Sequence, residues 1–161
     1  MLGAVLGTSS SFELNQDQKS SVPPLVTQRN MTKAILASGC SLDELSFLIA
    51  HASGTLKGDR SELSSINALL GKDMASLPVC ALKAYTGHMG VASDLAEIIF
   101  GILAVKENVI PASLNFRATE EAFSGLNISG SPQTSDKKRF LSSSYGIGGQ
   151  ASSVVIDVRQ G

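Results

Sequence analysis

The chain has two histidines, and each of them opens a short polar loop at the end of an apolar run. His51 follows residues 47–50, while His88 follows residues 79–82 and lies five residues after Lys83. Open α/β sheets place their ligands in such loops, where a buried strand ends beside titratable groups. The spacing therefore predicts one shared site of titratable side chains, although two unconnected loop histidines would fit the spacing equally well.

Two blocks around these histidines resemble a known family. Residues 51–55 (His-Ala-Ser-Gly-Thr), followed by Asp59 and Glu62, resemble the His-Gly-Thr-Gly-Thr…Asp…Glu signature of β-ketoacyl synthases. These are the condensing enzymes of fatty-acid and polyketide synthesis. Residues 83–88 (Lys-Ala-Tyr-Thr-Gly-His), with Glu97 nine residues further on, resemble the Lys-x-x-x-Gly-His…Glu block of the same family.

Two further blocks follow in the order that the family has them. Residues 109–116 (Val-Ile-Pro-Ala-Ser-Leu-Asn-Phe) resemble the family's Ile-Pro-x-x-Asn-Phe segment. Residues 144–149 (Ser-Tyr-Gly-Ile-Gly-Gly) resemble its Ser-Phe-Gly-Phe-Gly-Gly turn. The resemblance implies a thiolase-like fold, in which two similar halves pack together, and it places residues 1–161 in the C-terminal half.

Neither cysteine suits the nucleophilic role that a condensing enzyme requires. In this family the nucleophile lies in the N-terminal half, at a turn from a strand to a helix. Cys40 lies in a break after a helix, and Cys80 lies inside an apolar strand, where a thiol has a raised pKa and is unreactive. We therefore expect residues 1–161 to be a C-terminal domain whose N-terminal half is absent, and to be inactive alone.

The resemblance also assigns the catalytic histidines. A condensing enzyme decarboxylates a malonyl thioester, and the negative charge that develops on the thioester oxygen needs fixed donors in a dry pocket. The resemblance places His51 and His88 in this role, as neutral imidazoles that donate through Nε2. His88 precedes a helix that we expect to begin near Gly90, and the positive end of the helix dipole disfavours a charged imidazolium there.

Four charged residues accompany the histidines. Lys83 follows an apolar strand, so its buried ammonium needs a partner, and Glu97 is the predicted counter-charge. We expect this pair to belong to the catalytic site and to support His88. A lone surface lysine at the end of a strand is the alternative. Asp59 and Glu62 lie one helical turn apart near a helix N-terminus, which favours acidic side chains, and we expect both to be structural.

The loops also contain predicted substrate-binding residues. Ser53 and Thr55 could hydrogen-bond the amide-rich phosphopantetheine arm of the substrate, although bonds within the loop are the alternative. The glycine turn at residues 146–149 allows close backbone approach, and we expect Gly148 to line the substrate path. In the family a phenylalanine that gates the acyl pocket stands where this chain has Ile147, so pocket size and gating are in question.

Composition limits the partners. The net charge of −1 and the pI of about 6.1 argue against nucleic acid or an anionic membrane as a partner. Residues 91–105 are apolar but interrupted by Asp94 and Glu97, which argues against a membrane span. Two cysteines make no disulfide framework, so we expect a cytoplasmic protein. We expect no metal and no resident cofactor; the partners implied are the N-terminal half, an acyl carrier protein that bears the phosphopantetheine, and a second subunit in a homo- or heterodimer.

Strands and helices are expected to alternate along the chain. Apolar runs and hydrophobic periodicity predict strands at residues 2–8, 47–50, 77–82, 139–145 and 151–158, and helices at residues 25–37, 59–70 and 91–105. The helix at 91–105 is apolar on most of its surface and should be buried and central. Loops are expected at residues 9–24 and 113–138. This order predicts a three-layer α/β/α domain with a mostly parallel mixed sheet, and a single half should expose apolar surface.

Two alternatives to a catalytic half remain open. A chain-length-factor-like subunit would shape the pocket of another synthase without catalysis, but such relatives usually lose the active-site histidines that this chain keeps. A thiolase or a chalcone-synthase-like enzyme would also share the fold. A thiolase should show a second cysteine in a Cys-x-Gly turn near the C-terminus, and this chain has Ile147 in the corresponding glycine turn.

Overall fold

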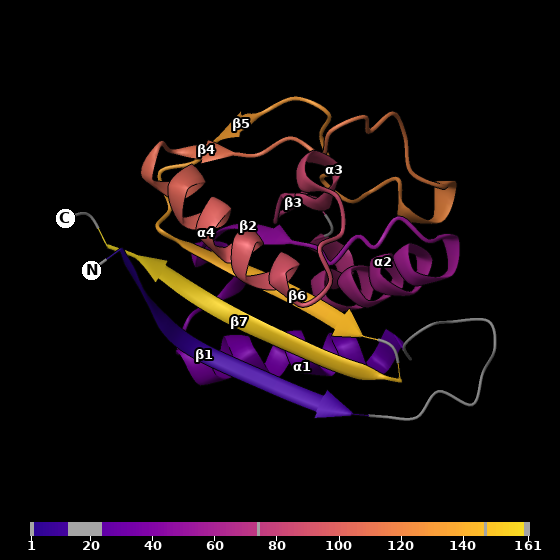
Figure 1. Ribbon diagram of the computed structural model, residues 1–161, viewed down its shortest axis with the longest axis horizontal. Coiled ribbons are helices and arrows are strands. Elements are labelled where there is room, and N and C mark those ends of the chain that lie inside the picture. Colours follow the sequence, from indigo (N-terminus) through magenta and orange to yellow (C-terminus); the bar gives the residue numbers. More distant parts are fainter. Residues whose placement is uncertain (1, 13–23, 74, 147, 160–161) are drawn as a thin grey trace.

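A computed structural model of the chain describes residues 2–12, 24–73, 75–146 and 148–159. Its centre is a five-stranded sheet in the order β1-β7-β6-β2-β3 (Figure 1). These strands are β1 (Gly3–Phe12), β7 (Gln150–Val158), β6 (Arg139–Gly146), β2 (Leu45–Ile49) and β3 (Val79–Cys80). The short strands β4 (Val109–Ile110) and β5 (Gln133–Thr134) form a second, two-stranded sheet.

The central strands bury apolar side chains on both faces, which is why the sheet is covered by helices on two sides. In β2, Leu48 joins the core beneath α1 (Pro24–Ser38) and α2 (Leu56–Leu70). Its neighbours Phe47 and Ile49 join the opposite core beneath α4 (Ala92–Lys106). The predicted α/β/α arrangement of three layers is therefore confirmed (Figure 1).

The sheet is mixed, as predicted, and most of its strands run in the same direction. Strand β2 is parallel to both β3 and β6, whereas β7 is antiparallel to both β1 and β6. The two antiparallel pairs arise because β6 and β7 form a hairpin and β1 then pairs with the outer side of β7. Strands β1, β6, β2 and β3 therefore run in one direction and β7 alone in this sheet runs in the other, so the predicted mostly parallel mixed sheet is confirmed.

Several element boundaries differ from those expected from the apolar pattern. Strand β1 continues to Phe12, so residues 9–12 of the expected loop belong to the strand, and residues 13–23 lie outside the described part of the chain. The extension is polar, and it is held by backbone pairing of Ser9, Ser10 and Ser11 with β7. The strand expected at 77–82 is confined to Val79–Cys80, because a one-turn helix, α3 (Lys83–Thr86), follows it.

Helix α4 is not buried on all sides, contrary to prediction. Its buried face consists of Ser93, Glu97, Gly101 and Val105, whereas an apolar stripe on another face is exposed. Gly101 allows close packing on the sheet, since a Cβ there would lie 2.7 Å from the Phe140 ring. The exposed stripe consists of Val91, Leu95, Ile99 and Leu103. Exposed apolar surface was the expectation for one half of a two-half fold.

Within the described residues, none of the helices combines the length and the apolar character that crossing a membrane requires.

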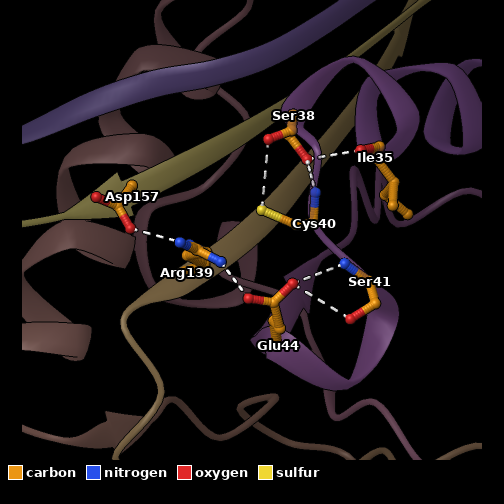
Figure 2. A network of polar contacts seen from close by, with 7 residues as sticks. All are labelled: Ile35, Ser38, Cys40, Ser41, Glu44, Arg139 and Asp157. Atoms are coloured by element: carbon orange, nitrogen blue, oxygen red, sulfur yellow. Dashed lines mark hydrogen bonds and ion pairs between the residues drawn. The ribbon is translucent and has the colours of Figure 1, made fainter.

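A network of polar contacts ties together the beginning of β6, the end of β7 and a short 3-10 helix, η1 (Leu42–Glu44) (Figure 2). Arg139 contacts Glu44 through one guanidinium nitrogen and donates from Nε to Asp157 Oδ1 at 3.1 Å. Glu44 also accepts the backbone N–H of Ser41 at 2.9 Å, as in a capping box at the start of η1. Cys40 lies beside this network (Figure 2). The cluster therefore fixes the end of the sheet where β6 starts.

Candidate active site

The two histidines meet at the edge of the sheet where β2 and β3 end. Their ring centroids lie 5.4 Å apart, and the ring planes are nearly perpendicular at 81°. His51 lies two residues after the end of β2 and is buried, whereas His88 follows α3 and is exposed. Because β2 and β3 are parallel, both loops leave the sheet at the same edge. The structure therefore brings the two predicted site histidines together.

A backbone contact determines which nitrogen of His88 carries a proton in the neutral ring. The N–H of Gly90 donates to Nδ1 of His88 at 3.1 Å. A nitrogen that accepts a hydrogen bond cannot also carry the proton, so the N–H of the neutral imidazole lies on Nε2. His88 can therefore donate from Nε2.

His51 is held in its neutral form by its surroundings. Burial in the first place, and then the nearby Lys83 and His88, together lower its pKa from 6.5 to about 4. Its Nδ1 is buried and has no hydrogen-bond partner within the described part of the chain. A neutral imidazole has one N–H to donate, which is what a site that stabilises an oxyanion requires.

Lys83 and Glu97 form the predicted ion pair, and both side chains are almost completely buried. Lys83 Nζ lies 2.7 Å from Glu97 Oε2, with 4% and 2% of the two side chains exposed. The alternative of a lone surface lysine is therefore wrong. Burial raises the pKa of Glu97, an effect that the Lys83 ammonium opposes. The second carboxylate oxygen, Oε1, has no partner among the described residues.

Glu62 clamps the backbone of the His51 loop. Its two carboxylate oxygens accept the N–H groups of His51 at 2.6 Å and Ala52 at 2.8 Å. Ala52 has a φ of +43°, a region that glycine adopts more easily, so these contacts stabilise a strained turn. Burial raises the pKa of Glu62 to about 7, although both backbone bonds oppose the shift.

Asp59 stabilises the same loop from the first turn of α2. Its Oδ1 accepts the N–H of Gly54 at 3.2 Å and the hydroxyl of Ser53 at 3.3 Å. These contacts match the structural role expected for Asp59. They also show why Asp59 and Glu62 are one turn apart, since each carboxylate reaches a different part of the loop.

The two loop hydroxyls are engaged locally. Thr55 caps α2 by accepting the N–H of Gly58 at 3.2 Å, and the oxygens of Ser53 and Thr55 lie 2.9 Å apart. Bonds within the loop, the alternative weighed for these residues, are therefore present. Both residues also line a pocket of about 390 Å³, which leaves them accessible to a ligand. Its lining consists of His51, Ser53, Thr55, His88, Tyr145, Gly146 and Gly148.

The glycine turn between β6 and β7 closes one side of this pocket. Gly148 has a φ of +95°, a conformation that an L side chain rarely adopts, and it contributes to the lining as predicted. Ile147, which stands where the family has a gating phenylalanine, lies outside the described residues. Tyr145, which the sequence interpretation did not select, packs on His51 with ring centroids 4.3 Å apart. The sequence signal that could have identified Tyr145 is its position in the 144–149 block, which resembles the glycine turn of the family.

Both cysteines lie away from the paired histidines. Cys80 is buried in the core under α4, and burial raises the pKa of its thiol well above the ordinary range. Cys40 lies beside the Arg139 network (Figure 2). The pocket lining, as far as the chain is described, contains neither of them. The described residues also contain no group of three or more histidines, cysteines or acids arranged to hold a metal ion.

Known proteins match this chain over most of its length. A phenolphthiocerol/phthiocerol polyketide synthase subunit of Mycobacterium tuberculosis is 30% identical over 167 residues, which cover 95% of this chain and 8% of that protein. The mitochondrial 3-oxoacyl-[acyl-carrier-protein] synthase of Arabidopsis thaliana is 31% identical over 131 residues, which cover 78% of this chain and 28% of that protein. The chain thus spans less than a third of either relative.

A solved structure shares the fold. In a complex of a type II polyketide synthase acyl-carrier protein with its ketosynthase, the match has a TM-score of 0.85 and 21% sequence identity. It covers 98% of this chain and 38% of that chain. The family model for the C-terminal domain of β-ketoacyl synthases matches residues 2–117. The chain therefore belongs to the β-ketoacyl synthase family, whose C-terminal domain it represents.

Proposed function

We propose that this chain is the C-terminal part of a β-ketoacyl-[acyl-carrier-protein] synthase and supplies both histidines for decarboxylative Claisen condensation in fatty-acid or polyketide synthesis. The observation that carries the proposal is the meeting of His51 and His88, with ring centroids 5.4 Å apart, in the lining of one pocket. Their contact joins two loops that the sequence separates by more than thirty residues.

The reaction needs donors and not a proton acceptor at its first step. The bond between the malonyl α-carbon and its carboxylate breaks, CO₂ leaves, and the electron pair forms an enolate whose charge rests on the thioester oxygen. N–H groups of His51 and His88 would stabilise that oxygen, because donors fixed in advance need no reorganisation as the charge develops. The α-carbon then attacks an acyl thioester on a cysteine of the N-terminal half, and the cysteine thiolate is released.

The surrounding residues have supporting roles in this proposal. The Lys83–Glu97 pair would hold the His88 loop, since α3 begins at Lys83 and α4 carries Glu97. Ser53, Thr55 and Gly148 would contact the phosphopantetheine arm, and Ile147 would border the acyl path. The chemistry requires neither a metal nor a resident cofactor. The partners would be the N-terminal half, an acyl carrier protein and a second subunit, in the cytoplasm.

A chain-length-factor-like subunit is the second candidate. It would use the same fold to shape the pocket of another synthase, without chemistry of its own. The Gly90 amide orients the His88 ring so that its Nε2–H can donate, and His51 is neutral. These two features favour a catalytic role instead, because a subunit that only shapes a pocket has no use for oriented donors.

The test is malonyl decarboxylation and condensation on a carrier protein, measured with this chain alone and with the N-terminal half added. We expect activity only with both halves, and its loss in His51→Ala and His88→Ala. Cys40→Ser and Cys80→Ala are the controls and should retain activity. An inactive complex of both halves would favour the chain-length-factor interpretation. Turnover by this chain alone, abolished by either cysteine substitution, would contradict the proposal.

A further inference from the structure

The two imidazoles of the site are held in different ways. Nδ1 of His88 accepts the N–H of Gly90 at 3.1 Å, so a hydrogen bond fixes the orientation of that ring. Nδ1 of His51 is buried without a partner within the described residues. Glu62 binds only the backbone of His51 and leaves rotation of the side chain free. The plane of the His51 ring must therefore be set by packing.

Tyr145 provides the closest ring contact to His51. Their ring centroids lie 4.3 Å apart with the planes tilted by 49°, compared with 5.4 Å between His51 and His88. The contact follows from the sheet, because β6 is parallel to β2 with Ser142 opposite Ile49. The residues that follow these two positions emerge at the same edge. Aromatic contacts at such distances orient rings as well as burying them.

The hydroxyl of Tyr145 reaches the loop that carries His51. Its oxygen lies 3.5 Å from Ser53 Oγ, which in turn contacts the Asp59 carboxylate at 3.3 Å. Gly58 provides the space for this arrangement, since a Cβ there would lie 2.7 Å from the Tyr145 oxygen and 2.8 Å from that of Ser53. Burial raises the pKa of the Tyr145 phenol, so the hydroxyl stays protonated and can donate.

We propose that Tyr145 is the positioning residue for His51: its ring fixes the plane of the imidazole, and its hydroxyl anchors that ring to Ser53. Tyr145 thereby does for His51 what the Gly90 amide does for His88. The family pattern that this block resembles has phenylalanine at this place, so the hydroxyl of Tyr145 is a departure from that pattern. The catalytic consequence rests on the proposed function, whereas the contact does not.

Nuclear magnetic resonance of this chain tests the contact without any assay of activity, because only two histidines have to be assigned. Nuclear Overhauser effects should connect the rings of Tyr145 and His51 in the unmodified chain. His51 should resist protonation down to about pH 4, with Lys83 and His88 as the titratable groups that face it. Absence of the Tyr145–His51 effects in the folded chain would overturn the proposal.

Matched variants separate the ring from the hydroxyl. Tyr145→Leu removes the ring, so His51 becomes wetter and should titrate at a higher pH than in the unmodified chain. Tyr145→Phe keeps the ring and should leave that titration nearly unchanged. Tyr85→Leu is the control, because Tyr85 is the other tyrosine and donates its hydroxyl to Ala112 at 3.0 Å. An unchanged His51 titration in folded Tyr145→Leu would overturn the proposal.

Kinetics with the N-terminal half added test the catalytic consequence. Tyr145→Leu should lower kcat for malonyl decarboxylation by roughly 10- to 100-fold, since a displacement of about 1 Å can cost that much, while KM changes little. Tyr145→Phe keeps the ring but loses its contact with Ser53, so kcat should fall by a smaller factor than in Tyr145→Leu. An inactive unmodified enzyme would refute the proposed function. The resonance measurement alone would then test whether Tyr145 contacts His51. An active enzyme that tolerates folded Tyr145→Leu would refute the positioning role.

Discussion

Ion pairs at the two ends of the sheet have opposite characters. Where β6 begins, Arg139 contacts Glu44 and Asp157, and 33% of the arginine side chain is exposed (Figure 2). Near the histidines, Lys83 and Glu97 lie 2.7 Å apart with only 4% and 2% of their side chains exposed. The first network joins strands at the surface, whereas the second places two charges inside the protein.

The two ends also differ in how completely their polar atoms are bonded. Both carboxylate oxygens of Glu44 have partners. By contrast, Glu97 Oε1 and His51 Nδ1 are buried without one among the described residues. Unpaired buried polar atoms cost stability, and they are concentrated where a fold serves chemistry. The difference indicates that the histidine end carries function at a cost in stability, while the Arg139 end only holds the fold.

The largest expected effect comes from breaking the buried pair. Lys83→Ala should lower the free energy of unfolding by about 3–5 kcal/mol, because it leaves the Glu97 carboxylate buried without a counter-charge. Chemical denaturation measures this loss. In the complete enzyme, the substitution should lower decarboxylation and condensation far more than acylation of the cysteine. Equal losses in both half-reactions would show that Lys83 supports the fold in general and not the histidine site.

The second prediction concerns pH and uses two groups with opposite shifts. Burial lowers the pKa of His51 from 6.5 to about 4, so the unfolded chain binds this proton more readily and stability rises as pH rises between those values. Burial raises the pKa of Glu62 from 4.5 to about 7, so the folded chain binds that proton more readily and stability falls as pH rises through that window. The two effects should nearly cancel between pH 4.5 and 6.5.

Single substitutions should reveal the pH dependence that each of the two groups contributes. Glu62→Gln leaves the titration of His51, so the free energy of unfolding should increase from pH 4 to 6.5. His51→Ala leaves the titration of Glu62, so the free energy of unfolding should decrease from pH 4.5 to 7. Each change should amount to at most about 3 kcal/mol, from a shift of about 2.5 pH units at 1.36 kcal/mol each. Denaturation curves at a series of pH values measure it. Parallel pH profiles for both variants would contradict the assigned pKa values.

The sequence predicted the pairing at the histidine end because the residues concerned are few and follow apolar runs. Spacing alone fitted two unconnected loop histidines equally well, and the family resemblance of the two blocks around them favoured a shared site and the Lys83–Glu97 pair, which the structure brings together. The ring contact from Tyr145 was not predicted, because it depends on the register between β6 and β2, which no local pattern shows. The clamp that Glu62 makes on the His51 backbone was underestimated for the same reason.

The fold was predictable where hydrophobic periodicity determines an element, and it was not predictable where hydrogen bonding between strands determines it. Helices α1, α2 and α4 lie close to the residues expected from their apolar spacing. The polar end of β1 was missed because backbone bonds to β7 determine it. The exposed stripe of α4 was missed because an apolar helix gives no indication of which face has a covering partner.

The smallest expected effect comes from the exposed network. Arg139→Ala should lower the free energy of unfolding by about 1 kcal/mol, since each exposed ion pair contributes roughly 0.2–1 kcal/mol. The loss should shrink in about 1 M salt, where charges are screened over about 3 Å, whereas the loss in Lys83→Ala should persist because its pair is buried. Arg139→Lys is the control, as it keeps the charge without the fork that reaches Glu44 and Asp157 together. Equal, equally salt-sensitive losses in Arg139→Ala and Lys83→Ala would show that burial does not distinguish the two ends of the sheet.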